Sequence, residues 1–163
     1  QNFQPHRRLE GYRLDFATHR PAFDRDLIAM RRTSKVERRR DITDVPFRIA
    51  ASMSHMELHR FVAVSQQGRQ LAQAEILLGD PEMMIVSGKA ALLSGWTASS
   101  QRPSENMAAL KFVIAAAIAE LVAERIESLQ ATIEAGESDQ AQLLQSVGFS
   151  LEQRGMIFSR ELT

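Results

Sequence analysis

Hydrophobic and polar residues alternate along several stretches of the chain, and this period of two predicts β-strands. Near the start, Tyr12, Leu14 and Phe16 alternate with Arg13 and Asp15, which gives a strand with one polar face. Turn-forming glycine and proline residues separate the strands in the middle of the chain, so these strands are expected to form an antiparallel meander. The further predicted strands span residues 61–64, 71–78, 83–86, 90–97 and 129–133, and a last strand follows Phe149.

Apolar residues at helical spacing predict four helices, of which the helix over residues 104–125 has the widest apolar stripe. Ser104 is the expected N-cap of that helix, with Glu105 in its first turn near the positive end of the dipole. Shorter helices are predicted over residues 23–30, 49–58 and 139–147. Gly148 follows the last of them and is suited to a helix C-terminus.

The composition is that of a globular protein, with 44% hydrophobic and 25% charged residues in a chain of 163. Twenty basic residues balance twenty acidic ones, so the net charge does not favour nucleic acid or membrane as a partner. The absence of cysteine excludes disulfides, thiolate metal sites and a cysteine nucleophile, and it suits a cytoplasmic location. We expect an N-terminal extension over residues 1–10 and a single domain over residues 11–163.

The most apolar stretch is the one from Met107 to Ala123, which Lys111 and Glu120 interrupt. A membrane span needs about 18 apolar residues, so no spanning segment and no membrane partner are expected.

The order of the predicted elements resembles that of the GNAT superfamily of N-acyltransferases. Three local matches carry the resemblance: the turn 68–74 into the third strand, the strand 90–97 followed by Arg102 and a long helix, and the tail 139–149 with its final Gly-Phe pair. The resemblance covers residues 11–163. It implies an α/β (α+β) fold, with a mixed, mostly antiparallel central sheet flanked by helices.

The resemblance also implies an activity, the transfer of an acetyl or other acyl group from acyl-CoA to the amine of a small molecule or peptide. In that scheme backbone N–H groups near Trp96, Thr97 and Ala98 polarise the thioester carbonyl. The loop that follows resembles the family's diphosphate-binding loop, an Arg-x-x-Gly-x-Gly/Ala pattern at a helix N-terminus. The residues expected there to bind the cofactor are Arg102, Ser104 and Asn106.

This loop departs from the family pattern at several positions. Ser104 or Glu105 stands where the first glycine is expected, and Met107 stands at the second small residue. Pro103 removes one N–H donor, and Glu105 brings negative charge to the place of the phosphates. Within about 4 Å such repulsion costs roughly 1 to 4 kcal/mol. The alternative interpretation is that Ser104 and Glu105 only cap a structural helix.

Few side chains are candidates for the chemistry. Glu75, on the predicted third strand, is the candidate general base that deprotonates the amine, although a solvent-facing glutamate on an alternating strand has the same pattern. Leu144 occupies the position of a tyrosine that acts as general acid in many family members, so that role does not carry over. Trp96 is interpreted either as a wall of the acyl pocket or as a core residue.

Two other patterns are weaker candidates. His55 and His59 have the i, i+4 spacing of a helical metal pair, but no third ligand is evident, so we expect no metal. The basic run 31–40 is interpreted as the solvated end of a helix followed by a loop, with an acidic partner, RNA or the 3′-phosphate of CoA as alternatives. No aromatic residues are interleaved with it, so nucleic-acid binding is not expected.

Two alternatives to catalysis by acyl-CoA remain open on sequence grounds. The missing glycines, Pro103, Glu105 and Leu144 are compatible with a non-catalytic GNAT-like binding or regulatory module. An aminoacyl-transferase domain resembling the FemAB branch is a second possibility, because that branch keeps the fold without the glycine-rich loop. A homodimer is compatible with either.

Overall fold

The computed structural model describes residues 4–20, 24–40, 57–78 and 90–159 of the chain. These residues form seven strands and three helices in the order β-α-β-β-β-β-α-β-α-β. The strands are β1 (Gln4–Asp15), β2 (Ser34–Arg40), β3 (Glu57–Ser65), β4 (Gln70–Leu78), β5 (Ala90–Ala98), β6 (Ser128–Glu134) and β7 (Ser150–Ser159). The helices are α1 (Arg25–Thr33), α2 (Pro103–Ala123) and α3 (Ser138–Val147).

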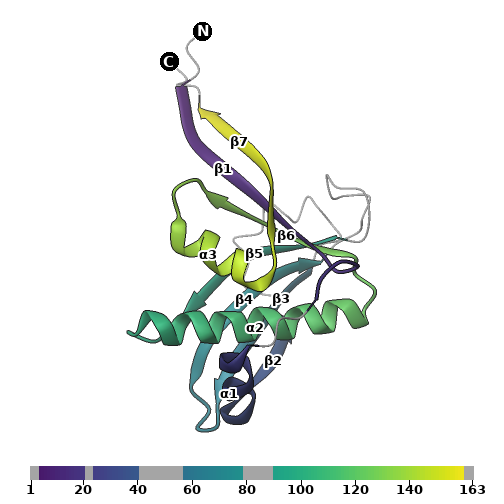
Figure 1. The fold of residues 1–163 in the computed structure, drawn as a ribbon, viewed down its shortest axis with the longest axis vertical. Helices are drawn as coiled ribbons and strands as arrows, with labels where there is room; N and C mark the ends of the chain where they lie inside the picture. Colours follow the sequence, from purple (N-terminus) through teal and green to yellow (C-terminus); the bar gives the residue numbers. More distant parts are fainter. Residues whose placement is uncertain (1–3, 21–23, 41–56, 79–89, 160–163) are drawn as a thin grey trace.

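All seven strands belong to one sheet, in the order β2-β3-β4-β5-β6-β1-β7. Each neighbouring pair is antiparallel except β5 and β6, which run parallel and are connected by α2. β1, the first strand of the chain, lies between β6 and β7 (Figure 1), and its first residue, Gln4, pairs with Ser159 at the end of β7. β1 begins at Gln4, so residues 4–10, which the sequence assigns to an N-terminal extension, take part in the sheet. The mixed, mostly antiparallel α/β fold is thereby confirmed.

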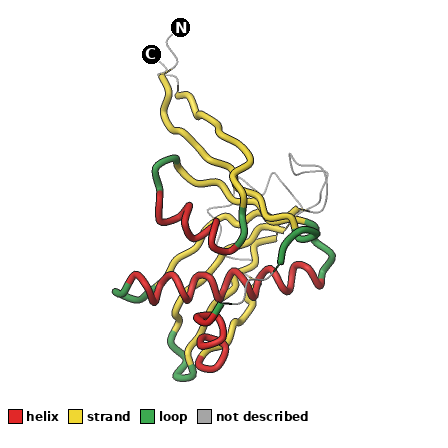
Figure 2. Tube along the Cα trace, in the orientation of Figure 1, coloured by secondary structure: helices red, strands yellow, loops and turns green. Residues whose placement is uncertain are grey.

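The alternation read from the sequence determines which strand residues reach the core. On β4, Ala72, Ala74 and Ile76 are buried against α2, while Gln73 and Glu75 point to the other face of the sheet. α2 lies across β3, β4 and β5, and α1 and α3 both contact α2 (Figure 2). The core is therefore a layer between one sheet face and α2.

α2 is long and apolar enough to cross a membrane by length and composition alone, although Lys111 and Glu120 lie within it. Its buried residues pack into the core on the sheet, as expected for the central helix of an α/β domain. The helix begins with Pro103, and Arg102 at its N-cap makes no side-chain capping hydrogen bond, so the expectation of a Ser104 N-cap is wrong. α3 ends as predicted, at Gly148 in the left-handed region with φ of 115°.

Only the first part of the basic run ends a helix, and the loop expected after residue 40 lies outside the described residues. Arg31 and Arg32 form the last turn of α1, and the run continues as strand β2, which pairs with β3. Charged side chains of β2 pair with one another: the Glu37 carboxylate lies 3.1 Å from the charged groups of both Lys35 and Arg39. These three side chains lie on one face of β2, which is an edge strand of the sheet.

Two predicted elements lie wholly or mostly outside the described residues. The strand 83–86 is one, and the helix 49–58 is the other. Leu58 and His59 belong to strand β3, so His59 is not one member of a helical histidine pair. In the described part of the chain, no group of three or more histidine and acidic side chains is placed to hold a metal ion.

Candidate functional site

The parallel strands β5 and β6 pair over only part of their length. Their ladder begins with Ala90 opposite Ser128 and ends with Leu93 opposite Ala131. Beyond that point β5 continues along β4 as far as Ala98, while β6 pairs with β1. The two strands therefore stop pairing with each other beyond Leu93 and Ala131. We call the region between their unpaired ends the β5–β6 wedge: residues 94–98 on one side and 132–134 on the other.

The hydrogen-bonding pattern of β5 determines which backbone groups face this wedge. The Ser99 N–H donates to the Leu71 carbonyl of β4 at 3.0 Å. Because successive residues of a strand direct their N–H and C=O groups to opposite sides, Trp96 and Ala98 direct theirs away from β4 and toward the wedge. The β5–β6 wedge thus contains N–H donors of the kind that would polarise a carbonyl.

The side chains of the same segment divide between the two faces of the sheet. Trp96 and Ala98 are partly buried and pack against the core on the α2 side. Gly95 and Thr97 lie on the other face, with Gly95 directly opposite Glu75 and Thr97 opposite Gln73. A side chain at Gly95 would come within 3.6 Å of the Glu75 carboxylate, so the missing side chain keeps open the space beside that carboxylate.

Glu75, the candidate base, lies in a polar cluster on this second face. Its carboxylate forms an ion pair with the Arg60 guanidinium at 3.3 Å and accepts a hydrogen bond from the Gln73 amide at 3.5 Å. The Glu75 side chain is 29% exposed. The sheet register brings Glu75 next to Gly95, in the segment of β5 that borders the β5–β6 wedge. Its partner Arg60 was not singled out in the sequence, where a single arginine on an apolar strand gives no distinctive signal.

The loop between β5 and α2 is closed by its own side chains. Asn106 holds Ser100 through two hydrogen bonds: its Oδ1 accepts from the Ser100 N–H at 2.8 Å and its Nδ2 donates to the Ser100 carbonyl at 2.7 Å. The Ser100 hydroxyl donates to Glu105 at 2.6 Å and accepts from the Arg102 N–H at 3.1 Å. Asn106 therefore supports the loop, and one of the N–H groups expected to hold phosphate already has an acceptor.

Glu105 is the acidic member of this loop. Its carboxylate lies 3.3 Å from Arg102. The hydrogen bond from Ser100 and the nearby charge of Arg102 lower the pKa of Glu105 below its usual value, so the group is ionised at neutral pH. A depression of about 480 Å³ beside the loop is lined by Arg69, Arg102 and Glu105 among others. Ser104 is exposed in the first helical turn, where its N–H has no acceptor within the helix.

The chain has no tyrosine at the position of the family's tyrosine. Leu144, at the corresponding position of α3, is fully buried in the core. Tyr12, the only tyrosine in the chain, is buried on β1, and its hydroxyl donates to Glu10 at 3.1 Å. Burial raises the pKa of Tyr12. A leaving thiolate would therefore have to take its proton from another source.

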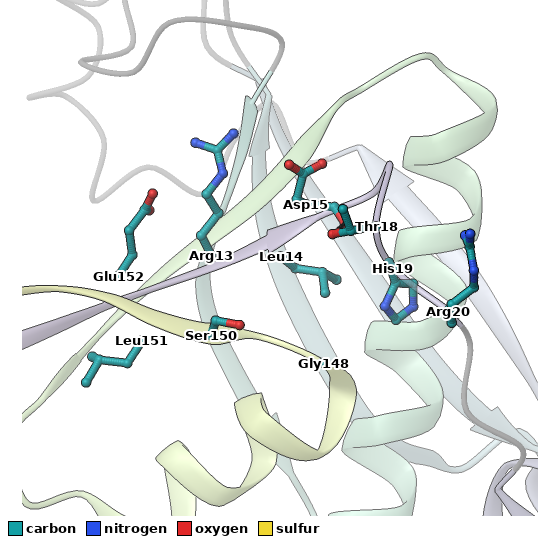
Figure 3. A pocket seen from close by; sticks show the side chains of 10 residues that line it. All are labelled: Arg13, Leu14, Asp15, Thr18, His19, Arg20, Gly148, Ser150, Leu151 and Glu152. Atoms are coloured by element: carbon teal, nitrogen blue, oxygen red, sulfur yellow. Dashed lines mark hydrogen bonds between the residues drawn. The ribbon is translucent and has the colours of Figure 1, made fainter.

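A second depression, of about 470 Å³, lies where β1, the loop after it and the start of β7 meet (Figure 3). It contains Arg13, Asp15, His19 and Arg20, none of which was expected to form a site. Arg13 and Arg20 lie at opposite sides of it, with Asp15 and His19 between them (Figure 3). Asp15 pairs with Ser128, at the start of β6. The β5–β6 wedge begins after Ala131, at the opposite end of the β5–β6 ladder. The two places are therefore distinct.

No family model matches the sequence, and no curated protein matches it. The fold, in contrast, has clear relatives among solved structures. A tandem GNAT protein from the clavulanic acid biosynthesis pathway superposes with a TM-score of 0.65 at 11% identity, over 96% of this chain and 54% of that one. A GCN5-related N-acetyltransferase from Sphaerobacter thermophilus gives 0.53 at 8% identity, over 96% and 52%. A GNAT-family putative acetyltransferase from Novosphingobium aromaticivorans gives 0.55 at 19% identity, over 91% and 61%.

This chain spans about half the length of the first two of these proteins. At such low identity the likeness concerns the fold alone. The chain has the fold of the GNAT acetyltransferases.

Proposed function

We propose that the chain is an N-acyltransferase that binds an acyl thioester in the β5–β6 wedge. The observation that carries this proposal is the early end of the β5–β6 ladder, which leaves the N–H groups of Trp96 and Ala98 without a strand partner among the described residues. A thioester carbonyl placed there would accept these hydrogen bonds. They would strengthen as negative charge develops on the oxygen during attack.

The proposed reaction is direct transfer within a ternary complex. The nitrogen of a primary amine attacks the carbonyl carbon, a C–N bond forms, and the C–S bond breaks with the electron pair leaving on sulfur. Glu75 takes a proton from the amine, directly or through water, and the proton is finally transferred to the thiolate. Arg60 keeps the Glu75 carboxylate in position beside Gly95, where the acceptor amine would approach.

The donor is proposed to be acetyl-CoA or another acyl-CoA, held mainly through its acyl and pantetheine parts. Arg102, Ser104 and the depression beside them are the proposed contact for the diphosphate, with Asn106 shaping the loop. Glu105 opposes this contact because its carboxylate is ionised and already pairs with Arg102. We therefore expect weak binding of the CoA diphosphate by the protein as it stands.

The second candidate function is a non-catalytic GNAT-like module, and the same carboxylate favours it. In this reading Glu105 permanently occupies the groups that would otherwise bind phosphate, namely the Ser100 hydroxyl and the Arg102 guanidinium. The domain would then keep the architecture and bind another partner or none.

Binding experiments with two thioesters separate these functions. Calorimetric titration with acetyl-CoA and with S-acetylpantetheine, which lacks the diphosphate, should give measurable and similar affinities for the native protein. Glu105→Gln removes the opposing charge and should tighten acetyl-CoA binding about tenfold, while leaving S-acetylpantetheine unchanged. The matched control is Glu137→Gln, at the N-terminus of α3, which should change neither.

Absence of binding by either thioester, in the native protein and in Glu105→Gln alike, would overturn the transferase proposal and leave the non-catalytic module. If thioester binds, product formation with a panel of primary amines then tests turnover.

A further inference from the structure

α2 carries a second apolar stripe in addition to the one that faces the sheet. Ala115, Ala119 and Val122 follow one another at helical spacing on its outer side, and the Val122 side chain is exposed in large part, at 50%. An apolar surface on both sides of a helix is typical of complete burial. Here the outer stripe lies open between α1 and α3. α2 therefore carries more apolar surface than it needs for packing on the sheet.

The outer stripe forms the floor of a cavity of about 500 Å³. α1 and α3 both contact α2 and supply the two walls, through Leu27 of α1 and Val147 at the end of α3. Phe16, in the loop after β1, completes the lining at one side. This volume lies within the range of small-molecule sites, and the alanines of the floor leave room for a ligand chain. The cavity shares no lining residue with the β5–β6 wedge.

The charged groups at this cavity are predominantly basic. Lys111 is balanced by Asp24, with 3.5 Å between ammonium and carboxylate. Arg31 lines the cavity, is exposed and forms no ion pair with any of the described residues. His19, also in the lining, has a pKa lowered by burial and is neutral at pH 7. One positive charge therefore remains at the rim of an otherwise apolar cavity.

We propose that this cavity binds a single-chain anionic amphiphile, a free fatty acid, with its carboxylate on Arg31 and its chain along Ala115 and Ala119. An apolar floor with one uncompensated cation at the rim matches a molecule that has an apolar chain and one negative end. The inference does not depend on the proposed transferase activity, because none of the wedge residues takes part.

The first experiment measures binding of hexanoate, octanoate, decanoate and dodecanoate by calorimetry, each below its micelle concentration. Affinity should rise by about threefold to fourfold with each added CH₂ until the cavity is filled. Decanol, which has a chain of the same length without the charge, should bind about tenfold more weakly than decanoate. Equal affinity for decanol, or no binding of dodecanoate, would overturn the proposal.

The second experiment uses matched pairs of variants at exposed positions, which keep the fold. Arg31→Gln should weaken decanoate binding about tenfold, whereas Arg32→Gln, on the next residue of the same helix turn, should not. Ala119→Phe fills the floor and should abolish binding, whereas Ala123→Phe, at the end of α2, should not. Binding that all four variants retain would be non-specific, and binding to phosphatidylglycerol vesicles without affinity for decanoate would indicate a membrane surface; either outcome contradicts the proposal.

Discussion

The guanidinium of Arg38 donates from Nε to Nδ1 of His59 at 3.0 Å, which determines the tautomer of a buried imidazole. Because Nδ1 accepts, the proton of neutral His59 is on Nε2, which lies 3.1 Å from the Glu57 carboxylate and donates to it. The same guanidinium forms ion pairs with Glu120 and Glu124 near the end of α2 and lies over the ring of Phe61 at 5.2 Å. These contacts connect β2 and β3 to the central helix.

This arrangement predicts a loss of stability in mild acid. Burial is the main cause that lowers the pKa of His59 below 6.5, and the charge of Arg38 lowers it further against the opposing effect of Glu57. Because the folded pKa lies below the unfolded one, the unfolded state binds more protons in the interval between them. The contribution of neutral His59 to the free energy of unfolding is therefore complete above about pH 6.5. It is lost progressively as the pH falls through that interval.

Chemical unfolding at pH values from 8 to 5 measures this effect. His59→Gln should flatten the part of the profile below about pH 6.5. The control is His19→Gln, since burial also lowers the pKa of His19 and its separate contribution must be subtracted. A profile for His59→Gln with the same slope as the native protein would show that His59 does not titrate in this way.

The alternation along β5 predicts a selective effect of proline at Ala98. The N–H of Ala98 faces the wedge. Proline at this position therefore removes an N–H group proposed to donate to the thioester carbonyl, without removing a hydrogen bond to β4. Acyl transfer should fall about 100-fold while the circular dichroism spectrum and melting temperature stay close to native. Thr97→Pro, one residue earlier, removes a β4 bond and should lower the melting temperature instead. Unchanged turnover in a folded Ala98→Pro protein would argue against the proposed donor.

The proposed base is tested at Glu75. Glu75→Gln keeps the size of the side chain and its contact with Gln73 but cannot accept the amine proton, so kcat should fall about 100-fold. Thioester affinity should not change, since the donor lies on the other side of β5. Glu152→Gln, on strand β7, is the matched control and should have native kinetics. Equal rates for the two variants at every pH would exclude Glu75 as the base.

Gly148 is predicted to be the glycine least tolerant of substitution among those described. Its φ of 115° lies in the left-handed region, and a Cβ there would come within 3.1 Å of His19 and 3.2 Å of Leu14. Gly148→Ala should therefore lower the free energy of unfolding by about 1 to 3 kcal/mol. Gly155→Ala is the control, because a Cβ added there would meet no atom within 4 Å, and it should be close to neutral. Denaturant titration of both variants decides the matter.

Much of the fold could be predicted because its signals are local. The alternation around Ala74 and the apolar stripe of α2 depend only on neighbouring residues, and both elements form where they were expected. β2 was missed for the opposite reason. Its basic residues suggest a solvated segment. The strand depends on contacts with residues distant in the sequence, such as those of Arg38 with Glu124 and His59.

The candidate site could be predicted only in part. The strand segment from Trp96 to Ala98 and the loop at Arg102 were identified by resemblance; the segment lies at the end of β5, and Arg102 is the N-cap of α2. The ion pair of Arg60 with Glu75 depends on the register between β3 and β4, which no pattern along a single strand specifies. The closed loop depends likewise on Asn106 reaching back to Ser100.

The position of β1 has a consequence for how the protein is made. β1 leaves the ribosome before every other strand of the sheet, but its two partners, β6 and β7, are the last of these strands to follow. Until they are synthesised, Tyr12 and Leu14 have no sheet in which to be buried. We therefore expect this strand to depend on chaperones during translation, and sheet closure to be the slow step of folding.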